Sequence, residues 1–346
     1  MSACEDCLQR AWLLGHLAGQ IEYARDRRGA VARLLALDSG DLIEAVGADR
    51  RREFAARDAA FDVVAARTAV AAAHLESRCR HESGFPPRLL DLDDAPSALF
   101  VAGSVGALEA LTEEDHEGPA VAVVGARRCA GEGPEVARAL GHDLAAAGVC
   151  VVSGLALGID GAAHAGALTA PRHAPLRGVA PTVAVLAGGA DVIYPRSART
   201  LYEGVRETGC VISEMPPGVT PRKWMFPARN RIIAALAGMT VVVQARQRSG
   251  SLITAELAMQ LGRPVGAVPG PVTSALSQGA NALLHDGAYV VRDARDVLDA
   301  LLPSGRLPDR PVAPALDPDL AIVLEAVDGG RGTPGEIAAL GVQGAA

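Results

Sequence analysis

The residues with the clearest capacity for chemistry form a basic run between positions 222 and 248. The run contains six basic residues and no Asp or Glu: Arg222, Lys223, Arg229, Arg231, Arg246 and Arg248. Asn230 stands between two of these arginines, directly before an apolar stretch at 232–236 that is typical of a helix. Guanidinium groups and the amino end of a helix both bind anions. The run therefore predicts an anion site centred on Phe226–Arg231, with Trp224 and Phe226 as rings that stack on bases.

A second anion-binding pattern begins at Ser249. Ser249-Gly250-Ser251 precedes another helical stretch, so two hydroxyls and free backbone N–H groups predict a phosphate cradle. The lysine of a P-loop is missing, so the pattern does not indicate nucleotide hydrolysis. Gly125-Ala126-Arg127 and Ser153-Gly154 each follow a predicted strand, where glycine lets the backbone approach a phosphate. A dinucleotide-binding fingerprint is absent, and we expect no cofactor.

Acidic and histidine side chains offer an alternative, catalytic interpretation. Glu214 follows a predicted strand, and Asp160 and His164 are four residues apart, which places them on one helix face. These groups would serve a Rossmann-like phosphoribohydrolase that cleaves nucleotides. A helix cap and a structural histidine explain Asp160 and His164 better, and Pro269-Gly270-Pro271 does not match the glycine-rich loop of such enzymes. We therefore expect a binding protein and not an enzyme.

The cysteines raise the question of a metal. Cys4 and Cys7 have zinc-like spacing, and Cys79 with His81 would complete a set of four ligands. The second pair, C-x-H, departs from the usual spacing of zinc sites, so we expect no bound metal. The sequence shows no signal peptide and no apolar run of the roughly 18 residues that span a bilayer. We expect reduced thiols and a cytoplasmic protein without a membrane partner.

The repeating pattern between residues 119 and 301 predicts the fold. Apolar runs alternate with Ala-rich helical stretches, which indicates βαβ units and strands buried on both faces. The predicted strands are 121–124, 149–153, 182–186, 210–213, 240–243, 265–268 and 289–291. We predict an α/β fold, an extended Rossmann-like, doubly wound, mostly parallel sheet, over residues 79–302. Loops at the carboxyl ends of its strands should converge on the ligand.

The flanking segments differ in composition. Residues 1–78 predict a small all-α domain, with 50–75 as one long helix, and 89–90 and 99–101 read as short extended pieces. Residues 303–316 are a Pro-rich linker, and 317–346 predict a truncated winged-helix-like segment. Proteins that bind nucleic acid without sequence preference are usually basic overall, whereas this chain has a net charge of −7. Any affinity for nucleic acid therefore depends on the local basic run.

Together these motifs resemble the DNA-processing protein A family (DprA, also called Smf). The similarity covers about half of the chain. It runs through GAR at 125–127, SGLALGIDGAAHAGAL at 153–168, YP at 194–195, ISEMPPG at 212–218, FPARNRIIAAL at 226–236, SGSLITAELA at 249–258 and GRPVGAVPG at 262–270. The sequence departs from the family pattern at Ala126, where Ser is common, and at Gln244, where an acidic residue is usual.

The resemblance implies a single-stranded DNA-binding protein of natural transformation and recombination. It implies a sterile-alpha-motif-like N-terminal domain, a homodimer, protection of single-stranded DNA and loading of the recombinase RecA. Carried over by position, the DNA-contacting residues are Arg127, Lys223, Arg229, Asn230, Arg231, Ser249 and Ser251, and the pocket is shaped by Gly125, Ser153 and Gly154.

Overall fold

The structure is a computed structural model that describes residues 3–24, 30–111, 120–171 and 180–301, together with Ile322, Ala326 and Thr333. The chain divides into two compact units, Met1–Ser304 and Gly305–Ala346. The predicted linker at 303–316 and the winged-helix-like segment at 317–346 lie outside the described residues, apart from those three positions. Among the described residues, every helix is too short or too polar to cross a bilayer.

A nine-stranded sheet forms the centre of the first unit, with the strand order β1-β2-β6-β5-β4-β3-β7-β8-β9. The first two strands pair antiparallel, β2 pairs antiparallel with β6, and every other pairing is parallel. The strands are β1 Glu76–Cys79, β2 Ala98–Gly103, β3 Ala120–Val124, β4 Cys150–Ser153, β5 Thr182–Val185, β6 Cys210–Ser213, β7 Met239–Val242, β8 Val265–Ala267 and β9 Tyr289–Val290. The predicted doubly wound, mostly parallel α/β sheet is confirmed.

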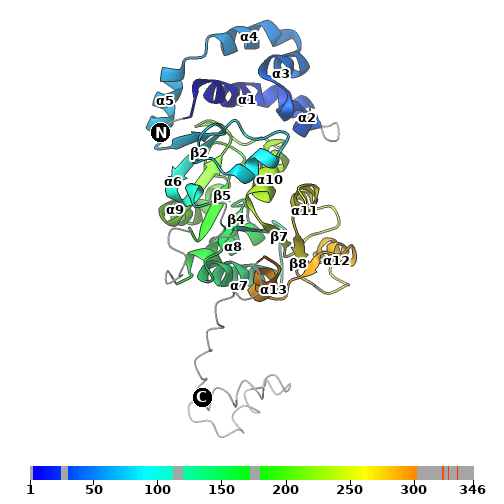
Figure 1. The fold of residues 1–346 in the computed structure, drawn as a ribbon. Coiled ribbons are helices and arrows are strands. Elements are labelled where there is room, and N and C mark those ends of the chain that lie inside the picture. The colour runs from blue at the N-terminus through cyan, green and yellow to red at the C-terminus, as the bar shows by residue number, and fades with distance from the viewer. Residues whose placement is uncertain are drawn as a thin grey trace. The chain divides into compact units, whose positions relative to one another are not determined.

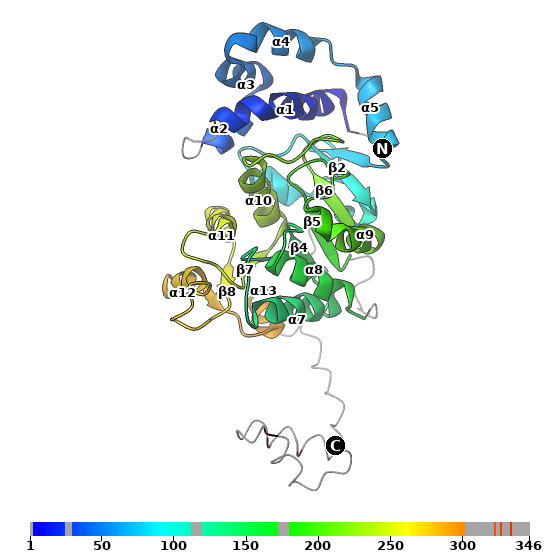
Figure 2. The ribbon, with the colours of Figure 1, turned by 180° about the vertical axis from the view of Figure 1, so that it is seen from behind.

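Helices cover both faces of this sheet, as Figures 1 and 2 show from opposite sides. Along β6, Cys210 and Ile212 pack in one hydrophobic cluster with α10 and α11, whereas Val211 packs in another with α9. Successive strand residues point to opposite faces, so unbroken apolar strands need this double cover. The helices of the sheet region are α6 Val105–Glu109, α7 Gly133–Ala146, α8 Ile159–Leu168, α9 Arg199–Thr208, α10 Met225–Leu236, α11 Gly250–Gln260, α12 Gln278–His285 and α13 Ala294–Leu301.

The N-terminal helices pack against the sheet near β2 and α10 (Figure 1). The Trp12 ring meets the Phe100 ring of β2 edge-on at 5.6 Å, and the Trp224 indole N–H donates to the Ala18 carbonyl at 2.9 Å. These helices are α1 Glu5–Ala24, α2 Ala30–Ala36, α3 Ser39–Val46, α4 Arg51–Ala59 and α5 Val63–Ala72. Residues 1–304 therefore form one compact unit, and the domain boundary at 78/79 stays a prediction.

Three local predictions were wrong. The long helix expected at 50–75 is broken into α4 and α5, because the Asp62 carboxylate accepts from the Val64 and Ala65 N–H groups and starts a new helix. Strand β1, Glu76–Cys79, begins within the segment 1–78 that was predicted to be helical. Leu89 and Leu90 belong to a 3₁₀ helix, Pro87–Asp91, in which proline occupies the first position.

The strand order creates a switch point between β3 and β7. From β3 the chain proceeds through β4 and β5 to β6 on one side, and then returns to place β7 on the other side of β3. The connections after these two strands leave in opposite directions, which opens a crevice at their carboxyl ends. The residues after β3, β4 and β7 are therefore positioned to form a binding site.

Candidate nucleic-acid interface

A pocket of about 290 Å³ opens at this switch point. The loops after β3, β4 and β7 line it, together with the first turns of α10 and α11. Of the residues predicted to contact or shape a DNA site, the pocket lining includes Gly125, Arg127, Arg229, Asn230, Ser249 and Ser251. The fold thus brings together predicted residues from three separate stretches of sequence.

The amino end of α11 supplies one wall of the pocket. Ser249 caps the helix: its hydroxyl accepts from the Ser251 N–H at 3.4 Å and lies 2.8 Å from the Ser251 hydroxyl. Asn230 of α10 donates to the Gly250 carbonyl at 3.2 Å and so holds the two helices in register. A Cβ placed on Gly250 would meet no atom of the described residues within 4 Å, so the backbone here is open to a ligand. Free N–H groups at a helix start favour a phosphate.

An exposed arginine and two aromatic rings form the rim. The Arg127 guanidinium lies 4.7 Å from the centroid of the Phe226 ring, and this ring lies 5.6 Å from the Tyr194 ring. Tyr194 is 49% exposed, and Arg127 is exposed too. A ring beside a cation offers a surface on which a nucleobase can stack while the charge meets the backbone. Tyr194 was not predicted as a site residue, although it lies in a strand-end loop.

Arg229 lies at the base of the pocket and is only 5% exposed. Its Nη1 donates to the Gly154 carbonyl at 2.7 Å and also to the Val185 carbonyl, which braces the ends of β4 and β5. Burial lowers the pKa of Arg229 to about 10, against the opposing charge of Asp160. The side chain therefore stays cationic at neutral pH. A Cβ at position 154 would lie 2.1 Å from Nη1, so any residue larger than glycine would displace the Arg229 guanidinium.

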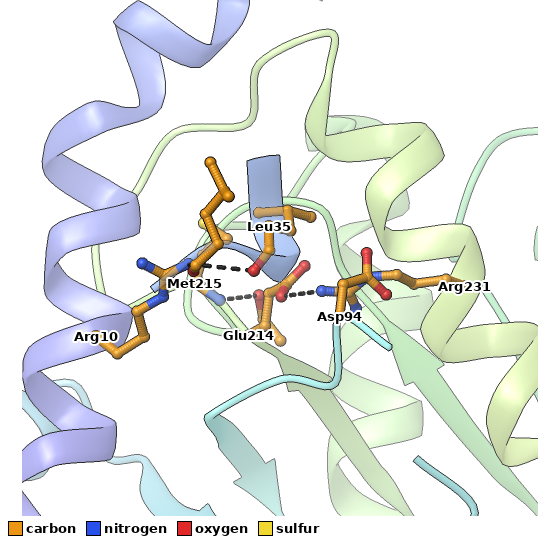
Figure 3. A network of polar contacts seen from close by, with 8 residues as sticks. Arg10, Leu35, Asp94, Glu214, Met215 and Arg231 are labelled. Carbon is orange, nitrogen blue, oxygen red and sulfur yellow. Dashed lines mark hydrogen bonds and ion pairs between the residues drawn. The ribbon is translucent and has the colours of Figure 1, made fainter. Parts of the chain in front are cut away.

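Arg231 occupies a different environment, away from the pocket lining. It is 4% exposed, and its guanidinium reaches between two carboxylates, as Figure 3 shows. Its Nε lies 2.9 Å from Asp94 Oδ2, and its Nη2 lies 2.6 Å from Glu214 Oε2. Burial lowers the pKa of Arg231, but Glu214 and Asp94 raise it above its ordinary value. The predicted direct contact between Arg231 and DNA therefore does not fit, because this charge is already paired inside the fold.

Three other residues predicted to contact DNA or shape its site lie outside the pocket lining, and two of them are buried. The Ser153 hydroxyl is fully buried and donates to the Val123 carbonyl at 2.7 Å, which joins β4 to β3. Lys223 is exposed in the turn before α10, outside the lining. Trp224 is 1% exposed, so the prediction that it stacks on bases was wrong.

The predicted acid–base groups are held by structural contacts. His164 is buried, and its Nδ1 lies 2.6 Å from the Thr182 hydroxyl, which itself donates to the Val151 carbonyl. Asp160 accepts from the Gly154 N–H at 3.2 Å. Glu214 is bound to Arg231. His164 is structural, as predicted. Asp160 is not the predicted helix cap, because Gly158 caps α8 without a side-chain bond and Asp160 instead holds the Gly154 N–H of the preceding loop. Glu214 is not placed as a free general base.

The buried His164 predicts a specific pH dependence. Burial lowers the pKa of His164 to about 3, from an ordinary value of 6.5. Between pH 6.5 and about pH 3 the unfolded chain binds a proton at His164 that the native state does not bind. The free energy of unfolding is therefore fully retained above pH 6.5 and decreases as the pH falls through this range. Replacing His164 with Gln should flatten the slope of unfolding free energy against pH by about 1.4 kcal/mol per unit. Urea titrations across this range test it, and equal slopes would contradict it.

The four candidate metal ligands also come together, away from the pocket lining. The thiol sulfurs of Cys4, Cys7 and Cys79 and a ring nitrogen of His81 all lie within 4.8 Å of one another. The sequence spacing did not predict how closely the two pairs approach, because 71 residues separate Cys7 from Cys79 without any regular pattern.

Comparison with known proteins identifies relatives of this chain. The model of a family described as DNA recombination-mediator protein A matches residues 76–302. DNA processing protein DprA of Streptococcus pneumoniae is 40% identical over 218 residues, which are 62% of this chain and 70% of that protein. Protein Smf of Escherichia coli is 39% identical over 237 residues, which are 68% of this chain and 59% of that protein. The matched region thus leaves a substantial part of each relative unaligned.

Solved structures agree with the sequence relatives. The X-ray structure of the S. pneumoniae protein superposes with a TM-score of 0.66 at 33% identity, and the match covers 88% of this chain and all 100% of that one. DNA processing protein A of Helicobacter pylori gives a TM-score of 0.56 at 27% identity, covering 66% of this chain and 97% of that one. The H. pylori protein has a single-stranded DNA binding mode that is described as unique.

Proposed function

Because the chain belongs to the DNA recombination-mediator protein A family, whose model matches residues 76–302, we propose that its switch-point pocket holds single-stranded DNA. The observation that carries this proposal is the exposed Arg127 stacked on Phe226, directly beside the open amino end of α11. The arginine neutralises a backbone phosphate, the aromatic ring accepts a base, and the helix start takes a second phosphate.

The proposed DNA contacts are Arg127, Asn230, Ser249 and Ser251, with Gly125 letting the backbone approach. Arg229 acts from the base of the pocket, where it sets the local positive field and fixes the strand ends. Lys223 contacts the strand outside the pocket, and Arg231 acts by holding α10 in place. Ser153 and Gly154 shape the pocket.

We propose that the bound strand is held and not hydrolysed. The two acidic groups with buried surroundings, Asp160 and Glu214, are engaged by a backbone N–H and by Arg231. These contacts favour structural roles for both carboxylates over the general base that the phosphoribohydrolase alternative needs. Incubation with nucleoside monophosphates should release no free base.

At the level of the pathway, we propose a role in DNA processing during natural transformation and recombination, in the cytoplasm. The names of the relatives support DNA processing. From the resemblance given under Sequence analysis we further propose a homodimer that protects single-stranded DNA and loads the recombinase RecA. The loading step is tested by the ATPase activity of RecA on single-stranded DNA that a single-strand-binding protein already covers. Sedimentation equilibrium tests the dimer.

Salt dependence tests the DNA-binding proposal directly. Affinity for a fluorescent oligo-dT, measured by anisotropy, should fall steeply between about 50 and 200 mM salt, with a log–log slope of about −0.7 for each phosphate neutralised. Oligo-dT and mixed-sequence strands should bind about equally, because phosphate contacts carry no sequence information. An affinity that does not change with salt, or no binding at all, would refute the proposal.

A further inference from the structure

Three thiols and an imidazole meet where α1 begins. Cys4 directly precedes α1, where its carbonyl accepts from the Leu8 N–H at 3.1 Å, and Cys7 lies in the first turn three residues later, so the two share one face. Cys79 ends β1, and His81 lies in the turn that follows it. The four potential ligand atoms lie within 4.8 Å of one another. Two distant stretches of sequence thus deliver two ligands each to one point.

The separations fit a tetrahedral metal centre. His81 Nδ1 lies 3.4 Å from Cys4 Sγ and 3.5 Å from Cys7 Sγ. Zinc bonds of about 2.3 Å to sulfur and about 2.1 Å to nitrogen give tetrahedral S···N edges of about 3.6 Å and S···S edges of about 3.8 Å. The two S···N separations from His81 therefore match such edges, and no pair of the four ligand atoms is more than 4.8 Å apart.

The surrounding backbone fixes this arrangement. The Cys4 N–H donates to Cys79 Sγ at 3.5 Å, and the Ala3 N–H donates to the Ser77 hydroxyl at 3.2 Å. Ala3 and Cys79 are completely buried. An N–H group that donates to a ligating sulfur orients the ligand and stabilises its thiolate form. The chain before α1 is therefore tied to β1 independently of any ion.

We propose that Cys4, Cys7, Cys79 and His81 bind one Zn²⁺ in a closed, tetrahedral Cys₃His site. Thiolates with an imidazole select zinc over the hard cations Mg²⁺ and Ca²⁺, which prefer oxygen. Binding would release the proton of each thiol that is still protonated, while neutral His81 donates the lone pair of Nδ1. Four protein ligands leave no position for substrate, so the site is structural. This proposal replaces the prediction of no bound metal.

The site would clamp the N-terminal helices onto the sheet. Cys7 and Cys79 belong to the same hydrophobic cluster as Phe100 of β2 and Val70 of α5. An ion at this point would join the start of α1 to the edge strand β1 and close a long loop that contains α2–α5. None of the four ligands lines the DNA pocket, so zinc is expected to affect stability and not the DNA contacts.

Metal analysis of the full chain tests the proposal. Protein expressed with added zinc and passed through a desalting column should carry about one Zn²⁺ per chain by elemental mass spectrometry. Cys7→Ser and Cys79→Ser should lose it. Cys129→Ser is the matched control, because Cys129 lies outside the cluster and the variant should keep the zinc content of the wild type.

The identity of the ligands is tested with cobalt, so that the test does not depend on variants that fail to fold. Wild-type protein loaded with Co²⁺ should show a thiolate charge-transfer band and the visible bands of tetrahedral cobalt. His81→Cys should keep one ion per chain with a shifted cobalt spectrum, whereas His81→Ala should bind the ion more weakly. Folded wild-type protein that contains no zinc and gives no tetrahedral cobalt spectrum would overturn the proposal. A disulfide between Cys4 and Cys7 in protein purified under reducing conditions would overturn it as well.

Discussion

Replacing Arg231 with alanine is expected to lower the free energy of unfolding by roughly 3–5 kcal/mol, a large fraction of the stability of a typical domain. The guanidinium contacts Asp94 and Glu214 at 2.9 and 2.6 Å, and the side chains of these three residues are 5–9% exposed. Its removal leaves two carboxylates with little solvent and no cation between them. Urea denaturation followed by circular dichroism measures the loss.

The matched control for this variant is Arg246→Ala, which removes the same charge from an exposed position of the same basic run. We expect it to change stability by no more than about 0.5 kcal/mol. A double variant, Arg231→Met with Glu214→Met, should recover part of the loss, because it removes one buried charge together with its partner. If Arg231→Ala keeps wild-type stability and instead loses affinity for single-stranded DNA, then Arg231 contacts DNA and the structural assignment is wrong.

Arg231 also shows where sequence reasoning reaches its limit. Within the run 222–248 no acidic residue occurs, so the sequence predicts an unbroken positive field. The partners of Arg231 come from outside that window, 137 and 17 residues away in the chain. Arg229 and Arg231 are therefore alike in local sequence but differ in surroundings. Only the tertiary fold determines which charge faces the pocket.

The strands, in contrast, could be predicted almost to the residue. Each of the seven predicted apolar runs forms a strand whose ends lie within one residue of the predicted ones. Six of these strands are buried along their whole length, as unbroken apolar runs predict, so there the local pattern carries the tertiary information. The prediction was wrong for β9, whose two residues are exposed at the edge of the sheet. The edge strand β1, Glu76–Cys79, contains Ser77 and Arg78 and has no such pattern, which is why it was missed.

Side chains at the site were harder to predict than the elements that carry them. Trp224 and Phe226 are two residues apart, yet one is sealed under α1 and the other forms the rim with Arg127. Gln244, where the family usually has an acidic residue, exchanges two hydrogen bonds with the backbone of Ala130 and fixes the loop after β3. Neither outcome follows from residue type, because both depend on which segment packs opposite.

Replacing Arg127 with alanine should weaken binding to single-stranded DNA by about ten- to a hundredfold, since a hydrogen bond to a charged group contributes roughly 1.5–3 kcal/mol. The variant should also make the log–log salt slope shallower by about 0.7, because one phosphate is no longer neutralised. Arg128→Ala is the matched control: Arg128 is the next residue and is exposed too, but it lies outside the pocket lining. Arg128→Ala should change both quantities much less.

Phe226→Leu separates stacking from charge at the same rim. The Phe226 ring contacts both the Arg127 guanidinium and the Tyr194 ring, so leucine keeps apolar contact but removes the aromatic face. We expect the binding free energy to weaken by roughly 1–3 kcal/mol for each base that stacks there, while the log–log slope of affinity against salt stays unchanged. Anisotropy titrations at several salt concentrations give both quantities for both variants. If Phe226→Leu changes the slope as much as Arg127→Ala does, the ring acts only by placing the arginine. If neither variant changes affinity, the DNA lies on another surface.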